Sequence, residues 1–244
     1  MGNTNVASAA SQGIFITFEG GDGAGKTTHV RFLEACLVRR GVRVVRLREP
    51  GGTSVGEQLR DIVLNPENDA LSSESELLIY EAARAQAVTQ VVKPALEAGA
   101  VVLADRFFDS TTAYQAYGRG LSLDFVKRAN AFACQGVVPT RTLLLQVAGG
   151  AAENLHRAEC VSAPDRMELA GLDFQQRVLA GFQAIAEAEP NRVRVVASYP
   201  DAAQTARGVF AALSDLFPWM ADPAVCDDAF FAQINEPAVS NGQV

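Results

Sequence analysis

The sequence predicts an α/β protein in which a five-stranded parallel sheet is flanked by helices. Three observations support this fold class. Short apolar runs alternate along the chain with segments of helical periodicity, as in doubly wound sheets. A glycine-rich loop joins the first apolar run to the first helical segment. The length of 244 residues and the hydrophobic content of 48% suit a single α/β domain with its own core.

The first strand and the loop that follows it carry a specific motif. Residues 14–18 read Ile-Phe-Ile-Thr-Phe, and residues 20–27 read Gly-Gly-Asp-Gly-Ala-Gly-Lys-Thr. This is the phosphate-binding pattern G-x-x-x-x-G-K-[ST], placed between a strand and a helix as the pattern requires. The glycines let consecutive N–H groups point at a polyphosphate, and the start of the helix adds a positive end.

We therefore expect this loop to bind the phosphates of ATP. The expected ATP-binding residues are Gly20, Gly21, Asp22, Gly23, Ala24, Gly25, Lys26, Thr27 and Thr28. Lys26 would neutralise the β- and γ-phosphates, and the Thr27 hydroxyl would reach Mg²⁺. The alternative is a chance match in a glycine-rich turn, but the strand, the loop and the helix agree with the phosphate-binding interpretation.

The remaining elements are assigned from apolar spacing and from helix-breaking residues. Helices are expected over residues 25–40, 54–64, 73–98, 110–117, 122–135, 150–160, 168–189 and 201–216, and strands over 42–47, 100–104, 142–147 and 193–197. Gly41 is expected to end the first helix, and Pro94 to kink the long third one or to start a new turn. The wholly apolar run at 100–104 predicts a buried strand. Ligands should then bind at the carboxyl ends of the strands.

The chain divides into three parts by composition. Residues 1–12 are small and polar, and we expect a disordered N-terminus. Residues 13–216 form the predicted domain. Residues 217–244 mix Pro, Asp, Asn and Gly, which predicts either a flexible tail or an arm that docks on a partner.

The net charge and the cysteines exclude several classes of function. The charge of −7 argues against non-specific binding to nucleic acid or to anionic membranes. The four cysteines, Cys36, Cys134, Cys160 and Cys226, are widely spaced and form no C-x-x-C pair, as expected of thiols in a reducing compartment. Because neither a secretory signal nor a membrane-length apolar run is visible, we expect a cytoplasmic protein.

Two clusters of polar residues directly follow predicted strands, and a third lies on one face of a predicted helix. They are Arg48-Glu49 after the second strand, Asp105-Arg106 after the third, and Tyr80 with Arg84, four residues apart on one helix face. Taken singly, these clusters could be a surface ion pair, a helix cap with a surface charge, and core packing. Taken together, they predict one crevice at the carboxyl edge of the sheet.

Longer segments around these clusters resemble the bacterial thymidylate kinases. The matching segments are residues 18–28 (FEGGDGAGKTT), 48–53 (REPGGT), 81–86 (EAARAQ) and 105–120 (DRFFDSTTAYQAYGRG). The resemblance covers residues 13–215 in the same order and at similar spacing. The segment 105–120 is the most specific of the four, because a phosphate-binding loop does not predict it.

The resemblance implies a P-loop kinase fold with a short lid at about 150–168, which phosphorylates dTMP to dTDP with ATP and Mg²⁺ in dTTP synthesis. It implies a dTMP site of Asp22, Arg48, Arg60, Tyr80, Arg84, Arg106, Thr111 and Gln115, catalytic residues Lys26, Asp105, Arg106, Arg157 and Arg166, and metal ligands Thr27, Asp22 and Asp105. Arg84 would bond the thymine carbonyl, Tyr80 would stack on the base, and Thr111 and Gln115 would touch its edge. Arg48, Arg60 and Arg106 would surround the acceptor phosphate. A homodimer formed through long helices is also implied.

The predicted lid departs from the family pattern. The family's lid is rich in basic residues, whereas residues 155–168 hold only Arg157 and Arg166, and the phosphate loop has Gly23 where some members carry Arg. We chose Arg166 as the residue that meets the transferring phosphate, with Arg157 second and Asp165 as the cap of the next helix. The alternative for Arg166 is an ion pair on the surface.

Two other functions stay open from the sequence. One is a kinase for another nucleoside monophosphate or for a deoxynucleoside. The other is a nucleotide-binding protein with little catalysis that uses residues 217–244 as an interaction arm. The arginine-poor lid, and Gln146 where the family's fourth strand usually has Asp, favour this last interpretation, whereas Lys26 and Arg106 favour an enzyme.

Overall fold

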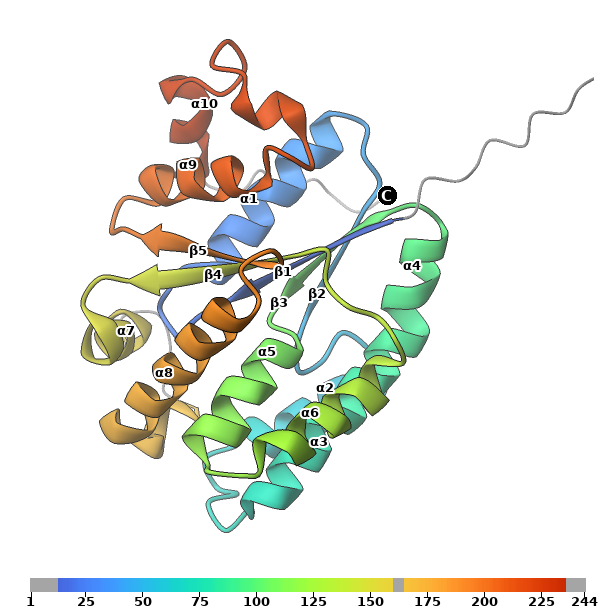
Figure 1. Cartoon of the computed structure of the whole chain (residues 1–244), viewed down its shortest axis with the longest axis vertical. Helices are drawn as coiled ribbons and strands as arrows, with labels where there is room; N and C mark the ends of the chain where they lie inside the picture. The colour runs from blue at the N-terminus through green and yellow to red at the C-terminus, as the bar shows by residue number, and fades with distance from the viewer. Residues whose placement is uncertain (1–12, 160–164, 236–244) are drawn as a thin grey trace, which may run out of the picture.

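The structure is a computed structural model that describes residues 13–159 and 165–235 (Figure 1). Its centre is a parallel sheet with the strand order β2-β3-β1-β4-β5. The strands are β1 (Ile14–Glu19), β2 (Val44–Arg48), β3 (Val101–Asp105), β4 (Arg141–Val147) and β5 (Val193–Ser198). The predicted five-stranded parallel sheet is confirmed, and each predicted strand lies within two residues of its observed bounds.

Helices connect successive strands and cover both faces of the sheet. They are α1 (Lys26–Arg39), α2 (Ser54–Leu64), α3 (Ser73–Ala87), η1 (Val88–Val92), α4 (Lys93–Glu97), α5 (Phe108–Thr111), η2 (Thr112–Gly118), α6 (Leu123–Cys134), α7 (Gly150–Glu159), η3 (Glu168–Ala170), α8 (Leu172–Ala188), α9 (Ala202–Leu213), η4 (Pro218–Ala221), α10 (Asp228–Ala232) and η5 (Gln233–Asn235). Side-chain caps fix several starts: Thr53 accepts from the N–H of Gly56 and begins α2, and Ser72 accepts from Ser75 and begins α3.

Three predicted helices differ from the observed ones in their internal geometry. The helix expected over 73–98 changes at η1 into a π-helical turn, and α4 then begins at Lys93 with Pro94 in its first turn, as one of the two expectations for this proline had it. The helix expected over 110–117 is α5 continued by the π-helix η2. The helix expected over 168–189 is interrupted at Gly171, which has a φ of 91°. Apolar spacing detects a helix but does not distinguish its hydrogen-bond register.

The sheet has a hydrophobic core on each face. On one face α1 and α9 pack through Leu33, Leu37 and Phe210. On the other face the strands pack against η1 and α4, and near β4 and β5 against α8 (Figure 1). All five residues of β3 are buried, as the apolar run at 100–104 predicts.

The C-terminal segment corrects our prediction of a tail beginning at residue 217. Residues 217–235 form η4, α10 and η5 and pack on the α1 and α9 face. Phe230 and Phe231 contact the ring of Phe210 edge-on, with centroids 5.4 and 5.2 Å away. The Pro and Asp content suggested a tail, but aromatic burial outweighs composition here. The predictions for 1–12 and 236–244 lie outside the described residues.

The register of the sheet gathers the strand ends that carry the predicted polar clusters. Asp105 at the end of β3 is paired with Phe18 of β1 on one side and with Arg48 of β2 on the other. The phosphate-loop sequence begins at Gly20, directly after β1. One edge of the sheet therefore presents the loop, Arg48 and Asp105 together, which is where doubly wound sheets bind ligands.

Candidate active site

A cavity of about 840 Å³ lies at this edge of the sheet. Most of the predicted site residues line it: Asp22, Gly23, Gly25, Lys26, Thr27, Thr28, Arg48, Arg60, Tyr80, Arg84, Asp105, Arg106, Thr111, Gln115 and Arg157. Gly20, Gly21 and Ala24 belong to the loop but not to the cavity wall, and Arg166 is also absent from the wall. The predicted convergence of the three polar clusters on one crevice therefore agrees with the geometry.

The glycine-rich loop wraps around the ammonium group of Lys26. The Nζ atom donates hydrogen bonds to the carbonyl oxygens of Gly20 (3.1 Å) and Gly21 (2.8 Å) and lies 3.9 Å from Oδ1 of Asp22. Lys26 is the first residue of α1 and is buried. Burial, together with the nearby Arg106 guanidinium, lowers the pKa of Lys26 to about 8. The lysine is thus desolvated and poised inside the loop, where an anionic ligand would favour its charged form.

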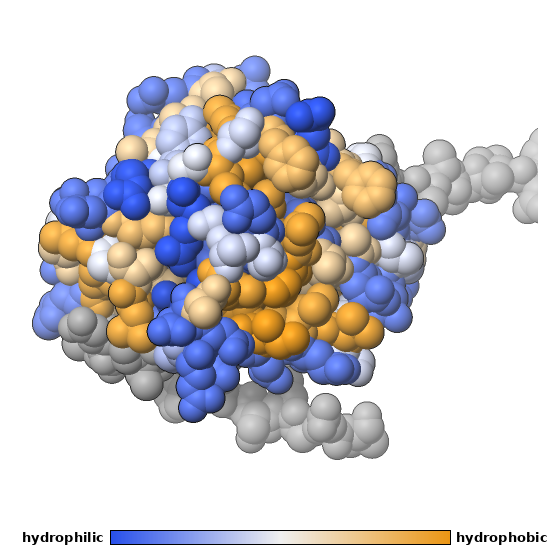
Figure 2. All heavy atoms as spheres, turned by 90° about the horizontal axis from the view of Figure 1, so that it is seen from below, coloured by the Kyte–Doolittle hydropathy of each residue, from blue (hydrophilic) through white to orange (hydrophobic). Residues whose placement is uncertain are grey.

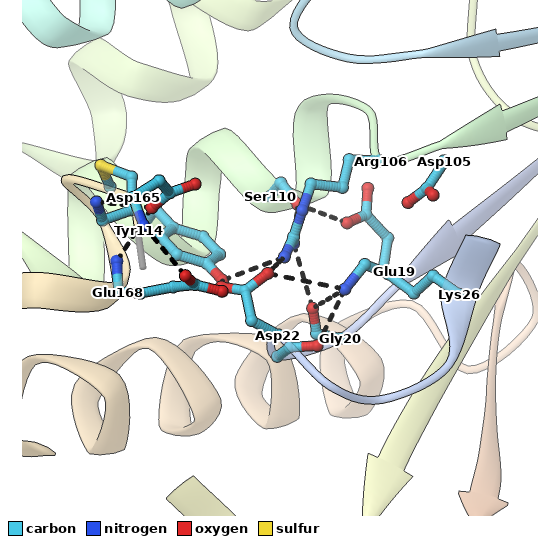
Figure 3. Close-up of polar contacts among 12 residues, drawn as sticks. Glu19, Gly20, Asp22, Lys26, Asp105, Arg106, Ser110, Tyr114, Asp165 and Glu168 are labelled. Atoms are coloured by element: carbon cyan, nitrogen blue, oxygen red, sulfur yellow. Dashed lines mark hydrogen bonds and ion pairs between the residues drawn. The ribbon is translucent and has the colours of Figure 1, made fainter. Parts of the chain in front are cut away.

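Arg106 links the loop to the other side of the cavity. Its backbone has a φ of 72°, which is unusual for a residue other than glycine. Its guanidinium donates to the Gly20 carbonyl (3.0 Å), to Oδ1 of Asp22 (2.5 Å) and to the Tyr114 hydroxyl (3.2 Å) (Figure 3). Burial alone would raise the pKa of Asp22, but the charges of Arg106 and Lys26 lower it below its usual value. Backbone strain and a buried ion pair at one residue are typical of a functional position.

Glu19 supports this arrangement, although we assigned it no role from the sequence. It ends β1, is fully buried, and accepts hydrogen bonds from the N–H of Phe107 (2.7 Å) and the hydroxyl of Ser110 (2.5 Å). Burial and the charge of Asp109 raise the pKa of Glu19 to about 8. The two bonds hold the backbone on the far side of Arg106, so Glu19 fixes the turn that aims the arginine. A charged residue at the end of an otherwise apolar strand was the available signal.

The side chains of Thr27 and Asp105 bring two oxygen atoms together in the cavity. The Thr27 hydroxyl donates to Oδ2 of Asp105 at 2.5 Å. Mg²⁺ prefers oxygen ligands and commonly takes one or two from the protein while keeping waters and phosphate oxygens, so this pair fits the ion. Asp22 fits less well, because its two oxygens accept from Arg106 and Tyr114. Residues 13–159 and 165–235 contain no cluster of three or more His, Cys, Asp or Glu that could hold a metal.

Arg84 lies at the centre of a buried polar network. Its Nε donates to Glu49 (2.9 Å), its Nη1 to Glu81 (3.0 Å) and Asn130 (3.1 Å), and its Nη2 to Thr111 (2.8 Å). Burial raises the pKa of Glu49 to about 7 even though Arg84 opposes the shift. Glu49 therefore does not form the surface ion pair with Arg48 that was the alternative from the sequence, and the sequence did not indicate Glu81 and Asn130 as partners of Arg84. A fixed guanidinium at the cavity wall can recognise a planar, hydrogen-bonding ligand.

Further cationic and aromatic side chains line the same cavity. Arg48 pairs with Glu57 of α2 (3.0 Å), and Arg60 donates to the carbonyl of Pro50 (3.0 Å). Tyr80 of α3 lines the cavity, and burial raises its pKa. Arg48, Arg60 and Arg106 together surround the space with positive charge, as the binding of an anionic group requires.

The structure reverses our order of preference for the lid arginines. Arg166 is buried, donating to Oε2 of Glu76 (2.5 Å) and to the carbonyl of Val63 (2.9 Å). It is therefore neither directed into the cavity nor part of a surface ion pair. Arg157 of α7 does line the cavity and pairs with Glu153 (2.8 Å). The spacing of residues along the sequence did not indicate Glu76, the buried carboxylate that holds the Arg166 side chain away from the cavity.

Asp165 caps a shorter element than we expected. Its Oδ1 accepts from the N–H groups of Met167 (2.8 Å) and Glu168 (3.0 Å), and Glu168 accepts in return from the N–H of Asp165. This reciprocal cap begins the 3₁₀ turn η3, whereas the long helix α8 starts at Leu172. These hydrogen bonds hold residues 165–168, the end of the lid that the structure describes, at the cavity.

The fold and the site are those of a P-loop phosphotransferase. The thymidylate kinase family model matches residues 18–206. Among curated proteins, the chain is 45% identical over 210 residues to a thymidylate kinase from Chlorobaculum parvum, covering 83% of this chain and 96% of that protein. It is 47% identical over 183 residues to one from Gloeobacter violaceus, covering 75% and 86%.

A solved structure agrees with these matches. The crystal structure of thymidylate kinase from Ehrlichia chaffeensis superposes with a TM-score of 0.64 at 34% identity, covering 77% of this chain and 88% of that one. The chain belongs to the thymidylate kinase family. The resemblance stated from the motifs, and the P-loop kinase fold that it implied, are confirmed.

Proposed function

We propose that this protein phosphorylates dTMP to dTDP with ATP as the phosphoryl donor. The observation that carries the proposal is the single cavity shared by the Lys26 loop, three arginines and the Arg84 network. It offers a donor site, an acceptor-phosphate site and a base site in one space. The relatives named thymidylate kinase, which match over most of this chain, support the same assignment.

The arrangement suits phosphoryl transfer, which needs positioning and charge neutralisation and no covalent nucleophile. The loop N–H groups and Lys26 would hold the β- and γ-phosphates of ATP. Arg48, Arg60 and Arg106 would hold the acceptor phosphate. Because Arg106 also contacts the Gly20 carbonyl of the loop, it would act between donor and acceptor, where charge develops in the transition state.

A magnesium ion is part of this proposal, held through Thr27 and Asp105. When bound, it would neutralise charge on the β- and γ-phosphate oxygens. The hydroxyl and the carboxylate of this pair bond each other and line the cavity together with Lys26, which would hold the phosphates. Asp22, which we also named as a metal ligand, is better placed to orient Arg106.

The base would be recognised by hydrogen-bonding groups on one wall of the cavity. The Arg84 guanidinium is a donor suited to the thymine carbonyl; it bonds Thr111, and Gln115 lines the same cavity. Tyr80, which also lines the cavity, would stack on the face of the base.

A panel assay tests the proposal against the two alternatives. ADP release would be measured with ATP and Mg²⁺ against dTMP, dUMP, dCMP, AMP and thymidine. We expect the largest kcat/KM with dTMP. Preference for another acceptor would favour a related kinase, and appreciable turnover with none of the five would favour a nucleotide-binding protein.

We further propose that the protein is a homodimer formed through α3 and α6, which pack together. These helices leave large apolar side chains exposed: Leu78 (58%), Phe125 (48%) and Phe132 (86%). Figure 2, which views the molecule from below, also shows hydrophobic residues gathered in a patch. Exposed apolar patches of this kind mark association surfaces.

Sedimentation at micromolar concentration tests the dimer. The Phe132→Asp variant is expected to dissociate it, whereas the control Val38→Glu, an equally apolar but separate position on α1 that is 55% exposed, should leave it intact. A monomeric wild-type protein would remove the proposal.

We propose that the protein acts in the cytoplasm. Cys36, Cys134 and Cys226 are free thiols, consistent with a reducing compartment. Within the described ranges, no helix has the length and apolarity needed to span a membrane. Localisation of a tagged full-length chain would test this expectation.

A further inference from the structure

The carboxylate of Glu76 is a fully buried charged group that joins three segments around the cavity. Oε1 accepts from Nε2 of Gln115 (2.8 Å) and from Nε of Arg119 (3.1 Å). Oε2 accepts from Nη2 of Arg119 (2.9 Å) and from Nη2 of Arg166 (2.5 Å). Its exposed fraction is 0%, so these four donors replace water entirely. Such a group is held in one geometry by its partners.

This geometry decides which end of the Gln115 amide faces the cavity. An ionised carboxylate only accepts hydrogen bonds, so the amide nitrogen of Gln115 must point to Glu76. The amide oxygen is then the atom left for the cavity that Gln115 lines. Glu76 therefore fixes the orientation of the Gln115 amide, so that the amide oxygen is the hydrogen-bond acceptor that faces the cavity.

The result is a donor, Arg84, and an acceptor, the Gln115 oxygen, on the wall of one cavity. Thymine presents the complementary pair, a carbonyl acceptor at position four and an N–H donor at position three. Cytosine presents the opposite pair, an amino donor and a ring-nitrogen acceptor. We propose that Glu76 is a positioning residue that makes the site select thymine over cytosine by fixing the amide of Gln115. This inference rests on the proposed function.

The Glu76→Gln variant would undo the selection through a definite rearrangement. The substituted side chain ends in an amide, whose oxygen and nitrogen must take the positions of the two carboxylate oxygens. The Oε2 position accepts from two guanidinium groups, whereas the Oε1 position accepts from Arg119 Nε and from the Gln115 amide, which is the one partner of the four that can turn and accept instead. The oxygen therefore stays at the Oε2 position, and the nitrogen takes the Oε1 position, where the bond from Arg119 Nε is lost. The Gln115 amide must then turn to accept from it, which sends the Gln115 nitrogen into the cavity. The wall would present a donor where thymine also has a donor.

The test is the ratio of kcat/KM for dTMP to kcat/KM for dCMP. We expect Glu76→Gln to lower this ratio at least tenfold. The matched control is Asp109→Asn, which neutralises another buried carboxylate; Asp109 bonds Arg192 through both oxygens (2.6 and 2.8 Å) and does not bond Gln115. The control should leave the ratio unchanged even if it lowers thermal stability by a similar amount. If Glu76→Gln does not fold, Glu76→Asp, whose shorter side chain cannot hold Gln115, replaces it.

A second experiment distinguishes a positioning role of Glu76 from a general disturbance of the site. In a Gln115→Leu background there is no amide to turn, so Glu76→Gln should no longer change the ratio. A change below fivefold in the single variant, an equal change in Asp109→Asn, or the same change in both backgrounds would each overturn the inference. Failure of wild-type protein to phosphorylate dTMP would instead contradict the proposed function, which keeps the two failures distinct.

Discussion

The backbone of Gly23 lies in direct contact with the backbone of Asn154. A Cβ atom added to Gly23 would lie 2.5 Å from the Asn154 carbonyl oxygen and 2.7 Å from Cβ of Arg157. Gly23 has a φ of 75°, which further disfavours a side chain. The helix α7 therefore rests on the phosphate loop, and this chain has no room for the arginine that some family members carry in the loop.

We predict that Gly23→Ala lowers kcat by about 10–100-fold, because α7 and the loop cannot both keep their positions. The matched control is Gly41→Ala, with a φ of 73° and no atom within 4 Å of the added Cβ. It shares the backbone strain, about 1–2 kcal/mol, without the clash. Equal kinetics for the two variants would show that the contact with α7 is irrelevant to catalysis.

Lys26→Ala should lower kcat at least about 100-fold while the protein stays folded. Lys26 contributes two hydrogen bonds to loop carbonyls and no apolar packing that the core depends on. Steady-state kinetics and thermal unfolding of the purified variant test this. Wild-type kcat would refute the phosphate-loop assignment.

Arg84→Ala should raise KM for dTMP by about 10–150-fold with little change in KM for ATP. The structure adds a second expectation, since the variant leaves Glu49 and Glu81 buried without their counter-charge. Breaking such a network destabilises a protein by about 3–5 kcal/mol. Arg84→Lys keeps the charge but loses the fork of donors, so it should recover part of the stability and little of the affinity. Equal KM changes for both substrates would mark Arg84 as structural.

Substitutions of the two lid arginines should have different effects on kcat and on thermal stability. We expect Arg157→Ala to lower kcat, because Arg157 lines the cavity, with KM little changed. Arg166→Ala should mainly lower thermal stability, because it removes a buried partner of Glu76. Both kcat values are measured at saturating ATP and dTMP. If both stay within threefold of wild type, no lid arginine stabilises the transition state.

Stability should fall as the pH rises through the titration of Glu19. Its folded-state pKa of about 8 lies above the usual 4.5, so the folded state binds this proton more tightly than the unfolded state. The resulting stabilisation is complete below pH 4.5 and is lost as the pH rises through 8. The urea midpoint of wild type should drop between these limits, and Glu19→Gln should show a smaller drop. Parallel curves for the two proteins would contradict the assignment.

The sequence by itself determined the sheet, the order of its elements and the family. The alternation of apolar runs with helical periods, and the loop at residues 20–27, depend on local spacing, which a sequence displays directly. The positions of Lys26, Asp105 and Arg106 in one cavity followed from the rule that parallel strands end at one edge.

Tertiary structure alone decided the partners of the buried charges. Glu76 withdraws Arg166 from the cavity across 90 positions of sequence, and Glu19 fixes the turn of Arg106 from another strand. It also decided that residues 217–235 pack on α1 and α9, through aromatic contacts with Phe210. Such outcomes depend on desolvation and on which side chains meet in space, and neither is encoded in the spacing of residues along the chain.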